Sequence, residues 1–361
     1  MTEILDVTTR HQVAQFLAFP DSIYPTATRW VAPLRIHVRH MMGSLQGADR
    51  GYWLALEQGQ LLARLGARVH HDRAEPALHF GFFECRPGSQ GAVRALFSRA
   101  HQIAPELPMR GPYHYHQEDP YAGILVQGFD ENPTLMMPYN PPYYEDYLAQ
   151  AGLEPLMDLY SYEFARDRFR PDLMRSRANR AFDRGVRVRT MDPWRRHRDM
   201  SSIIEMVNQT HSRNWGFEEY KGDMARELLL LGRFFLEPGL VFLAFHGGQP
   251  VGFVIIVRDF NPLLKPARGR LGLGLLWRFL FGGKRLDVYR GYGIGVLEGA
   301  RALDVGAALV QAVVEESQRH PRGRVLEVAW TLANNRPMNA LAVALGGRRN
   351  KVHRIFQRAP G

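Results

Sequence analysis

Residues 295–309 have the residue types of a site for a phosphorylated ligand. The segment reads GVLEGARALDVGAAL, strand-like at its start and helix-like toward its end. The N-terminus of a helix offers free N–H groups and a partial positive charge to an anion. Arg301 adds a cation just before the helix. Compact residues at the helix start would let a phosphate approach the main chain: Val305, Gly306, Ala307 and Ala308.

One residue of this segment opposes a phosphate site. Asp304 directly precedes the helix, where an aspartate can cap the free N–H groups. Its carboxylate would also repel a phosphate bound at the same turn. The pattern R-x-x-D-x-G therefore indicates an anion site only because it follows a strand and opens a helix.

The elements that must position this segment form two similar halves. Two strand–turn–strand patterns, at 53–60 and 242–249, share Leu-Ala followed by Gly-Gln. Chance recurrence is the alternative to duplication. Alternating strands and helices follow in each half, which predicts an α/β fold with a mixed, mostly antiparallel twisted sheet flanked by helices. We expect a first domain over residues 1–168 and a second over residues 169–361.

Hydrophobic periodicity and turn residues locate the elements of the second half. We expect strands, apart from the hairpin, over residues 186–190, 289–297, 325–330 and 351–358. We expect helices over residues 200–213, 221–235, 305–319 and 335–344. The phosphate-binding candidate then lies between the second of these strands and the helix that follows it.

This order of elements resembles the GNAT acyltransferase fold, and the whole chain resembles a family of bacterial tandem GNAT-like proteins. The resemblance rests on the R-x-x-D-x-G stretch and on the segments FGFFE at 80–84, PYNPPYY at 138–144, NWGF at 214–217 and VAW at 328–330. It implies acyl-CoA (acetyl-CoA or longer) as co-substrate, bound at the turn before Val305, and no metal. The first half lacks a matching motif.

The resemblance also implies how the reaction is assisted. A main-chain N–H of the fourth strand polarises the thioester carbonyl, and Val296 and Leu297 are the candidates. The acceptor amine must lose a proton before it can attack. The base candidates are Glu298, just after the fourth strand, and Glu327, on the fifth. Glu327 alternates with Leu326 and Val328, so its side chain points to the face opposite theirs. For both glutamates the alternative is an ordinary charged surface residue.

Asn335 is the other candidate for the catalytic centre. It would contact the amide groups of the cofactor's pantetheine arm, or it would only cap the following helix. Ala342 stands where the family usually has a tyrosine acid. The resemblance therefore leaves the departing thiolate without an identified acid.

Four further residues are expected to line the acceptor pocket. Tyr139 and Asn140 belong to the aromatic segment of the first half, for which turn formation and packing are the alternative. Trp215 and Trp330 lie in the two tryptophan-containing segments of the second half.

Composition bounds the partners and the compartment. The net charge is +10, which favours anionic partners. No known nucleic-acid-binding motif occurs, so nucleic acid is disfavoured. The single cysteine, Cys85, excludes a disulfide framework and a thiolate-rich zinc site. The N-terminal residues lack a signal-peptide pattern, so we expect a cytoplasmic protein.

An apolar insert, Leu271–Phe281, precedes the candidate phosphate site. With its basic neighbours it would suit peripheral contact at the inner face of the membrane. It would equally suit the wall of a pocket for a long acyl chain, or a helix packed on the core. If either functional alternative holds, replacing Leu275, Trp277 and Phe279 with polar residues should abolish liposome association or the use of long-chain acyl-CoA.

The leading hypothesis is an acyl-CoA-dependent N-acyltransferase that acts on a small-molecule or lipid-like amine. The first alternative is a catalytically idle binding or regulatory protein of the same fold. The second is a transferase that uses aminoacyl-tRNA as donor, which would bind tRNA in a salt-dependent way. The oligomeric state does not follow from the sequence.

Overall fold

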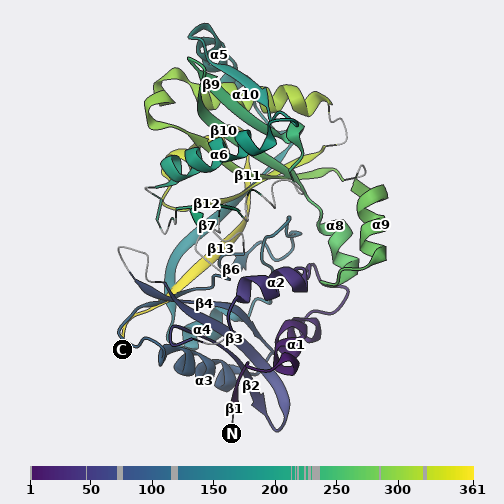
Figure 1. Ribbon diagram of the computed structural model, residues 1–361, viewed down its shortest axis with the longest axis vertical. Helices are drawn as coiled ribbons and strands as arrows, with labels where there is room; N and C mark the ends of the chain where they lie inside the picture. Colours follow the sequence, from purple (N-terminus) through teal and green to yellow (C-terminus); the bar gives the residue numbers. More distant parts are fainter. Residues whose placement is uncertain are drawn as a thin grey trace. The chain divides into compact units, whose positions relative to one another are not determined.

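The computed structural model describes residues 2–45, 47–70, 76–114, 121–212, 214–215, 217, 219–222, 225–226, 229, 236–283, 286–319 and 323–361 (Figure 1). The chain divides into two compact units. The first contains Met1–Tyr160, Phe260–Lys284 and Asn350–Gly361, and the second contains Ser161–Asp259 and Arg285–Arg349. Strands β7 and β13 each begin in one unit and end in the other.

The first unit is built on a mixed sheet with the strand order β1-β2-β3-β4-β5-β13-β7. Its strands are β1 (Glu3–Asp6), β2 (Arg50–Glu57), β3 (Gln60–His70), β4 (Ala77–Cys85), β5 (Met109–Gly111), β6 (Ile124–Gln127), β7 (Glu154–Ala165) and β13 (Arg348–Arg358). Its α-helices are α1 (Arg10–Ala18), α2 (Arg35–Met42), α3 (Gln90–His101), α4 (Tyr144–Gln150), α8 (Asn261–Leu264) and α9 (Leu273–Gly282).

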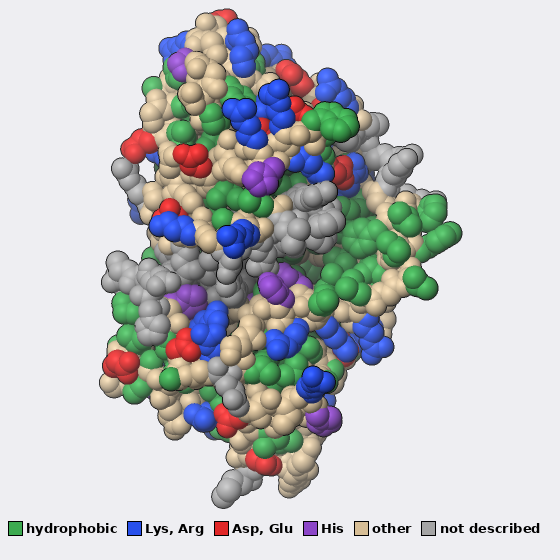
Figure 2. Space-filling view, in the orientation of Figure 1, with side chains coloured by type: hydrophobic (Ala, Val, Ile, Leu, Met, Phe, Trp, Pro, Cys, Tyr) green, Lys and Arg blue, Asp and Glu red, His purple; other side chains and the backbone are tan. Residues whose placement is uncertain are grey.

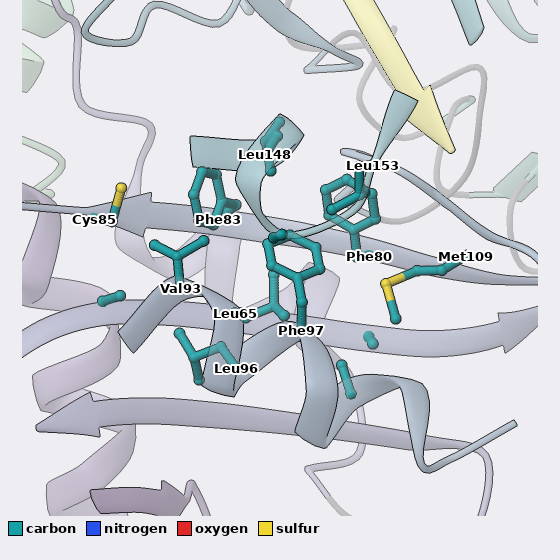
Figure 3. Packing of buried hydrophobic residues seen from close by; sticks show 14 of the residues in the cluster. Leu65, Phe80, Phe83, Cys85, Val93, Leu96, Phe97, Met109, Leu148 and Leu153 are labelled. Atoms are coloured by element: carbon teal, nitrogen blue, oxygen red, sulfur yellow. The ribbon is translucent and has the colours of Figure 1, made fainter. Parts of the chain in front are cut away.

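Side-chain alternation along β2 supplies two separate cores. Trp53 and Ala55 pack with α3 and α4, whereas Tyr52 and Leu54 pack with residues of α1 and α2 on the opposite face. Figure 3 shows the first of these cores, in which the rings of Phe80 and Phe97 meet edge to face with centroids 5.0 Å apart. The sheet of the first unit is thus covered by helices on both faces.

The second unit has the strand order β7-β12-β11-β10-β9-β8. Besides β7, its strands are β8 (Arg187–Thr190), β9 (Val241–His246), β10 (Gln249–Arg258), β11 (Val288–Val296) and β12 (Val325–Leu332). Its α-helices are α5 (Asp172–Asp183), α6 (Arg196–His211), α10 (Val305–Arg319) and α11 (Arg336–Ala344), and a 3-10 helix, η5 (Glu298–Leu303), precedes α10.

Helices again lie on both faces of this sheet. The buried residues Val305 and Leu309 of α10 join Ala181 of α5 in a core with Phe242 and Val254. α6 packs on β10 and β11 from the other side. The turn between β11 and α10, which contains the candidate site, is therefore held by the sheet and by α5.

The sequence predicts most of these elements, including both hairpins and the start of α10 at Val305. It predicts neither α2 nor α5. Most of the helix expected over 221–235 lies outside the described residues. The expected domain boundary between residues 168 and 169 separates two duplicated halves. The division into compact units does not test duplication, so this boundary stays a prediction.

Candidate active site

β11 carries the candidate site because one of its edges opens along its second half. The parallel pairs with β12 end at Gly291–Val328, although β11 continues to Val296. On the other side, antiparallel pairing with β10 continues to Val296 but skips Tyr292, which forms a β-bulge. Beyond the bulge, the residues of β11 are therefore not paired with residues of β12.

Two N–H groups of this segment point toward the open edge. The Leu297 N–H donates to the Val251 carbonyl at 3.0 Å. Because hydrogen-bonded and non-hydrogen-bonded pairs alternate in an antiparallel ladder, the N–H groups of Val296 and Ile294 turn away from β10. The expectation for the carbonyl-polarising donor thus narrows to Val296, since the Leu297 N–H is already used within the sheet.

Glycines in β11 let helix α6 approach the strand closely. A Cβ atom added at Gly295 would lie 2.5 Å from Phe253 Cε1 and 2.7 Å from Thr210 Oγ1. Only a residue without a side chain fits there. The close packing brings the C-terminal end of α6, where His211 lies, beside the open segment of β11.

His211 is a candidate functional residue that the sequence analysis missed. Its half-buried ring forms a hydrogen bond with the main chain of Ile294, the residue that faces the open edge. Burial lowers the pKa of His211, and this hydrogen bond partly opposes the shift. A neutral imidazole that donates through one nitrogen has the other available to accept a proton. The signal in the sequence was its place just before the NWGF segment.

The turn after β11 has the conformation that a phosphate-binding glycine would give it. Asp304 adopts the left-handed conformation with φ 57° and ψ 27°, which aspartate tolerates better than most side chains. The N–H groups of Ala307 and Ala308 both donate to the Asp304 carbonyl. The N–H groups of Val305 and Gly306 thus remain as the donors of the first turn that a phosphate oxygen could use.

The Asp304 carboxylate is bound by arginines of α5. Arg177 Nε donates to it at 2.7 Å and Arg180 Nη2 at 3.3 Å. The hydrogen bond from Arg177 holds the pKa of Asp304 below its usual value, so the group is ionised and paired. Arg184 also reaches the turn and donates to the Ala302 carbonyl. The repulsion expected from Asp304 is therefore countered by two cations far away in the sequence.

Two other predicted residues lie at this turn, with different exposure. Arg301 is exposed on η5, and its carbonyl accepts from the Asp304 N–H. Gly306 has open space around it, because an added Cβ would meet only Val296 Cγ2, at 3.9 Å. The packing of the protein itself does not require a glycine at this position.

Glu327 is buried, with 3% of its surface exposed, and lies on the paired part of β12. Its register partner is Arg290, which is also buried and whose guanidinium donates to the Ala329 carbonyl. Paired residues of neighbouring strands project from the same face, so a carboxylate and a guanidinium lie side by side. This environment suits a structural charge pair, and the role of Glu327 as base stays a prediction.

Asn335 caps helix α11. Its Oδ1 accepts from the Met338 N–H at 3.3 Å, the bonding expected of an N-cap. Ala342 is buried in the same helix. Trp330 and Trp215 are half-buried in the second unit. The proposed roles of Asn335 in catalysis and of the two tryptophans in an acceptor pocket stay predictions.

Tyr139 and Asn140 belong to the first unit. Asn140 is buried, and its amide accepts from the Leu125 N–H and donates to the Leu125 carbonyl, so it replaces a strand partner for β6. The Tyr139 hydroxyl donates to the Phe129 carbonyl. These contacts fit the packing alternative, and the lining of an acceptor pocket by the two residues stays untested.

Among the described residues, no group of three or more His, Cys, Asp or Glu side chains has an arrangement that could hold a metal ion. Within the same part of the chain, no helix combines the length and the apolar character needed to cross a membrane.

Comparison with known proteins relates the second unit, and the fold of the chain, to a known family. Residues 202–346 match the model of the acetyltransferase (GNAT) family, a range that runs from α6 to α11. A solved tandem GNAT protein from the clavulanic acid biosynthesis pathway superposes with a TM-score of 0.56 over 100% of this chain and 99% of its own, at 16% identity. Residues 202–346 thus form a GNAT acyltransferase domain, and the chain along its length has the fold of a tandem GNAT protein.

Two bacterial relatives match along nearly their whole length. Protein YghO of Escherichia coli (strain K12) is 26% identical, and the match covers 97% of this chain and 93% of the relative. A protein of Caulobacter vibrioides (strain NA1000 / CB15N) named bacterial ceramide synthase is 22% identical, with coverage of 99% and 97%. The similarity thus extends across both units of the chain.

Proposed function

We propose that this acyltransferase moves an acyl group from acyl-CoA to the nitrogen of an amine. The observation that carries the proposal is the turn between β11 and α10. There Asp304 supplies a left-handed backbone while its charge is paired, and Gly306 leaves space at the first turn of the helix. A diphosphate accepts hydrogen bonds and favours positive surroundings, and this turn offers both.

The residues at this turn fit the phosphate part of acyl-CoA. The N–H groups of Val305 and Gly306 would donate to the diphosphate, and Arg301 would contribute charge. Acyl-CoA would supply an acyl group activated as a thioester. The main-chain N–H of Val296 would stabilise the charge that develops on the carbonyl oxygen of that group.

His211 is the residue best placed to take the proton of the amine. Its lowered pKa keeps the ring neutral near pH 7, which a base requires. Glu327 is the second candidate, but it lies beside the buried cation Arg290. The balance is simple: a C–N bond forms, the C–S bond breaks, the amine proton goes to the base, and CoA leaves as a thiolate that solvent protonates.

We propose a long-chain, lipid-like amine as acceptor and a long acyl chain as donor. The relative named a ceramide synthase supports this, since a ceramide is an N-acylated long-chain amine. The exposed apolar helix α9 also supports it, because such a surface suits substrates that reside in membranes.

Ligand titration tests the donor. We expect acetyl-, octanoyl- or palmitoyl-CoA to raise the unfolding temperature, and a saturating ligand at 100 times its Kd adds about 2.7 kcal/mol of stability. Free CoA should compete with the acyl form. Absence of stabilisation by every acyl-CoA would favour the idle scaffold, and salt-dependent tRNA binding would favour an aminoacyl-tRNA donor.

Substitution of His211 tests the base. His211→Gln keeps a side chain that can donate to the Ile294 carbonyl but cannot take up a proton, and we expect kcat to fall about 100-fold. In the unsubstituted enzyme, kcat/KM should decline only below pH 6.5, because burial moves the pKa of His211 below that value. Glu327→Gln is the comparison variant. An unchanged pH profile in His211→Gln, with the acid limb lost in Glu327→Gln, would reassign the base to Glu327.

A further inference from the structure

Exposed large apolar side chains cluster on and next to helix α9 more than in any other segment of the described residues. Six of the eleven exposed large hydrophobic residues fall within residues 271–281. Leu273 is 86% exposed, Leu280 68% and Trp277 65%. Figure 2 shows these hydrophobic side chains gathered over α8 and α9. A contiguous apolar patch on a water-facing surface usually marks a docking site.

Helical spacing places the exposed residues on one face. Leu276 and Trp277 lie three and four residues after Leu273, and Leu280 lies four and three residues after them, which puts the four along one side of α9. The three residues chosen from the sequence to test this insert differ in exposure. Leu275 is buried, and the Phe279 ring packs 5.4 Å from that of Phe260, so of the three residues first chosen only Trp277 faces outward.

The helix is supported from within the first unit. Asn261, at the start of α8, donates to the Pro133 carbonyl, and Arg268 donates to the carbonyls of Asp21 and Tyr24. The Arg35 N–H donates to the Gly269 carbonyl. These contacts fix the segment that carries α9 to the first unit. The outward orientation of the apolar face of α9 is therefore set by the fold.

The charged residues of the segment that carries the patch have one sign. Residues 260–286 contain no aspartate or glutamate, but they contain Lys265, Arg268, Arg270, Arg278, Lys284 and Arg285. Arg270 and Arg278 are exposed beside the apolar face. Leu, Trp and Phe side chains flanked by arginines match a bilayer with anionic headgroups, where apolar groups enter the acyl boundary and cations stay at the surface.

We propose that α9 docks on the surface of anionic phospholipid bilayers through Leu273, Leu276, Trp277 and Leu280. The helix lies in the interface, since at ten residues it is too short to span. Docking does not depend on the transfer chemistry, but it deepens the proposed function, on which this part rests, by bringing the chain to the membrane in which a lipid-like amine resides.

Vesicle flotation tests this docking with the full chain. The probes are phosphatidylcholine vesicles and vesicles that also contain phosphatidylglycerol. We expect binding to the anionic vesicles, at least tenfold weaker binding after Leu273→Gln, Trp277→Gln and Leu280→Gln together, and weaker binding after Arg270→Gln with Arg278→Gln. The matched control substitutes three exposed apolar residues elsewhere, Leu173→Gln, Trp194→Gln and Val343→Gln, and should bind like the unsubstituted chain.

The proposal would be overturned if the α9 triple variant bound vesicles as strongly as the unsubstituted chain. It would also be overturned if neither of them bound. A third outcome against it is a change from dimer to monomer in the triple variant, measured by sedimentation, with vesicle binding unaffected, which would assign the patch to a second copy of the chain. Stabilisation by acetyl-CoA should be equal in all variants, so failure of docking is distinguishable from failure of the transferase proposal.

Discussion

The two units contain the same strand–turn–helix arrangement with different groups at the turn. In the first unit, between β4 and α3, the main chain is bound by tyrosines of α4. The N–H of Cys85 donates to the Tyr144 hydroxyl at 3.0 Å, and that of Gly88 donates to the Tyr147 hydroxyl at 2.7 Å. In the second unit, between β11 and α10, the groups that approach the turn are two arginines of α5 and Arg184, which directly follows that helix.

The difference indicates which turn is available to a ligand. A main-chain N–H that already donates to a buried hydroxyl would have to lose that bond before it could bind a phosphate. The main-chain N–H groups at the turn of the first unit are therefore used in internal packing. The turn of the second unit has unused donors, a nearby cation and a glycine that its own packing does not require. We therefore propose that the first turn serves stability and the second serves binding.

The largest effect on the KM for acyl-CoA is expected from a negative charge at the second residue of α10. The same change at the second residue of α3 is the comparison. Gly306 and Gly91 are both the second residue of their helix, and both have room for a side chain. We expect Gly306→Glu to raise the KM for acyl-CoA about 100-fold, equivalent to about 2.8 kcal/mol. Gly91→Glu should leave KM unchanged. Glutamate suits the first turn of a helix, so neither variant should lose stability.

Measurement of KM and unfolding temperature in both variants checks this expectation. An increase in KM for Gly91→Glu but not for Gly306→Glu would reverse the comparison and place the donor site in the first unit.

A smaller effect is expected from the arginines that pair with Asp304. Arg177→Ala with Arg180→Ala leaves the carboxylate unpaired at the turn, and we expect the KM for acyl-CoA to rise about tenfold, or about 1.4 kcal/mol. Asp304→Asn should change KM less than about twofold, because the charge is already countered in the unsubstituted chain. Steady-state kinetics at low and high salt would check both. A tenfold lower KM in Asp304→Asn would mean that the carboxylate still repels the phosphate.

The smallest effect on activity is expected in the first unit. Tyr144→Phe removes the hydroxyl that donates to Glu84 at 2.7 Å and accepts from the Cys85 N–H. Loss of a buried hydrogen-bond partner should lower the free energy of unfolding by about 2 kcal/mol. The KM for acyl-CoA should not change. Denaturant unfolding measures the first quantity, with Tyr139→Phe, which removes one less buried bond, as the milder control.

The sequence predicts local features of the site well. The helix starts at Val305 as expected, because compact residues after a turn-forming aspartate make a helix start recognisable without knowledge of the remaining chain. Both hairpins were also predictable, since strand alternation and Gly-containing turns are local signals. The family resemblance pointed to the correct fold for the same reason.

Features that depend on distant contacts were missed. From the sequence Asp304 is expected to repel phosphate, since nothing near it in the chain suggests that Arg177 and Arg180 bind it. Alternation on a strand indicates Glu327 as a base, but burial beside Arg290 follows only from the register of β11 and β12. The place of His211 at a helix end does not by itself indicate a function, because the strand beside it is known only from the fold.

The sequence by itself determined where strands, turns and helices begin, and it set the excess of arginine and the apolar character of α9. These follow from backbone preferences and hydrophobic periodicity over a few residues. The tertiary structure alone decided that tyrosines of α4 bind one turn and arginines of α5 the other, and that the outer face of α9 stays exposed. Such contacts join residues far apart in the chain, and their energies depend on burial and geometry that only the folded molecule provides.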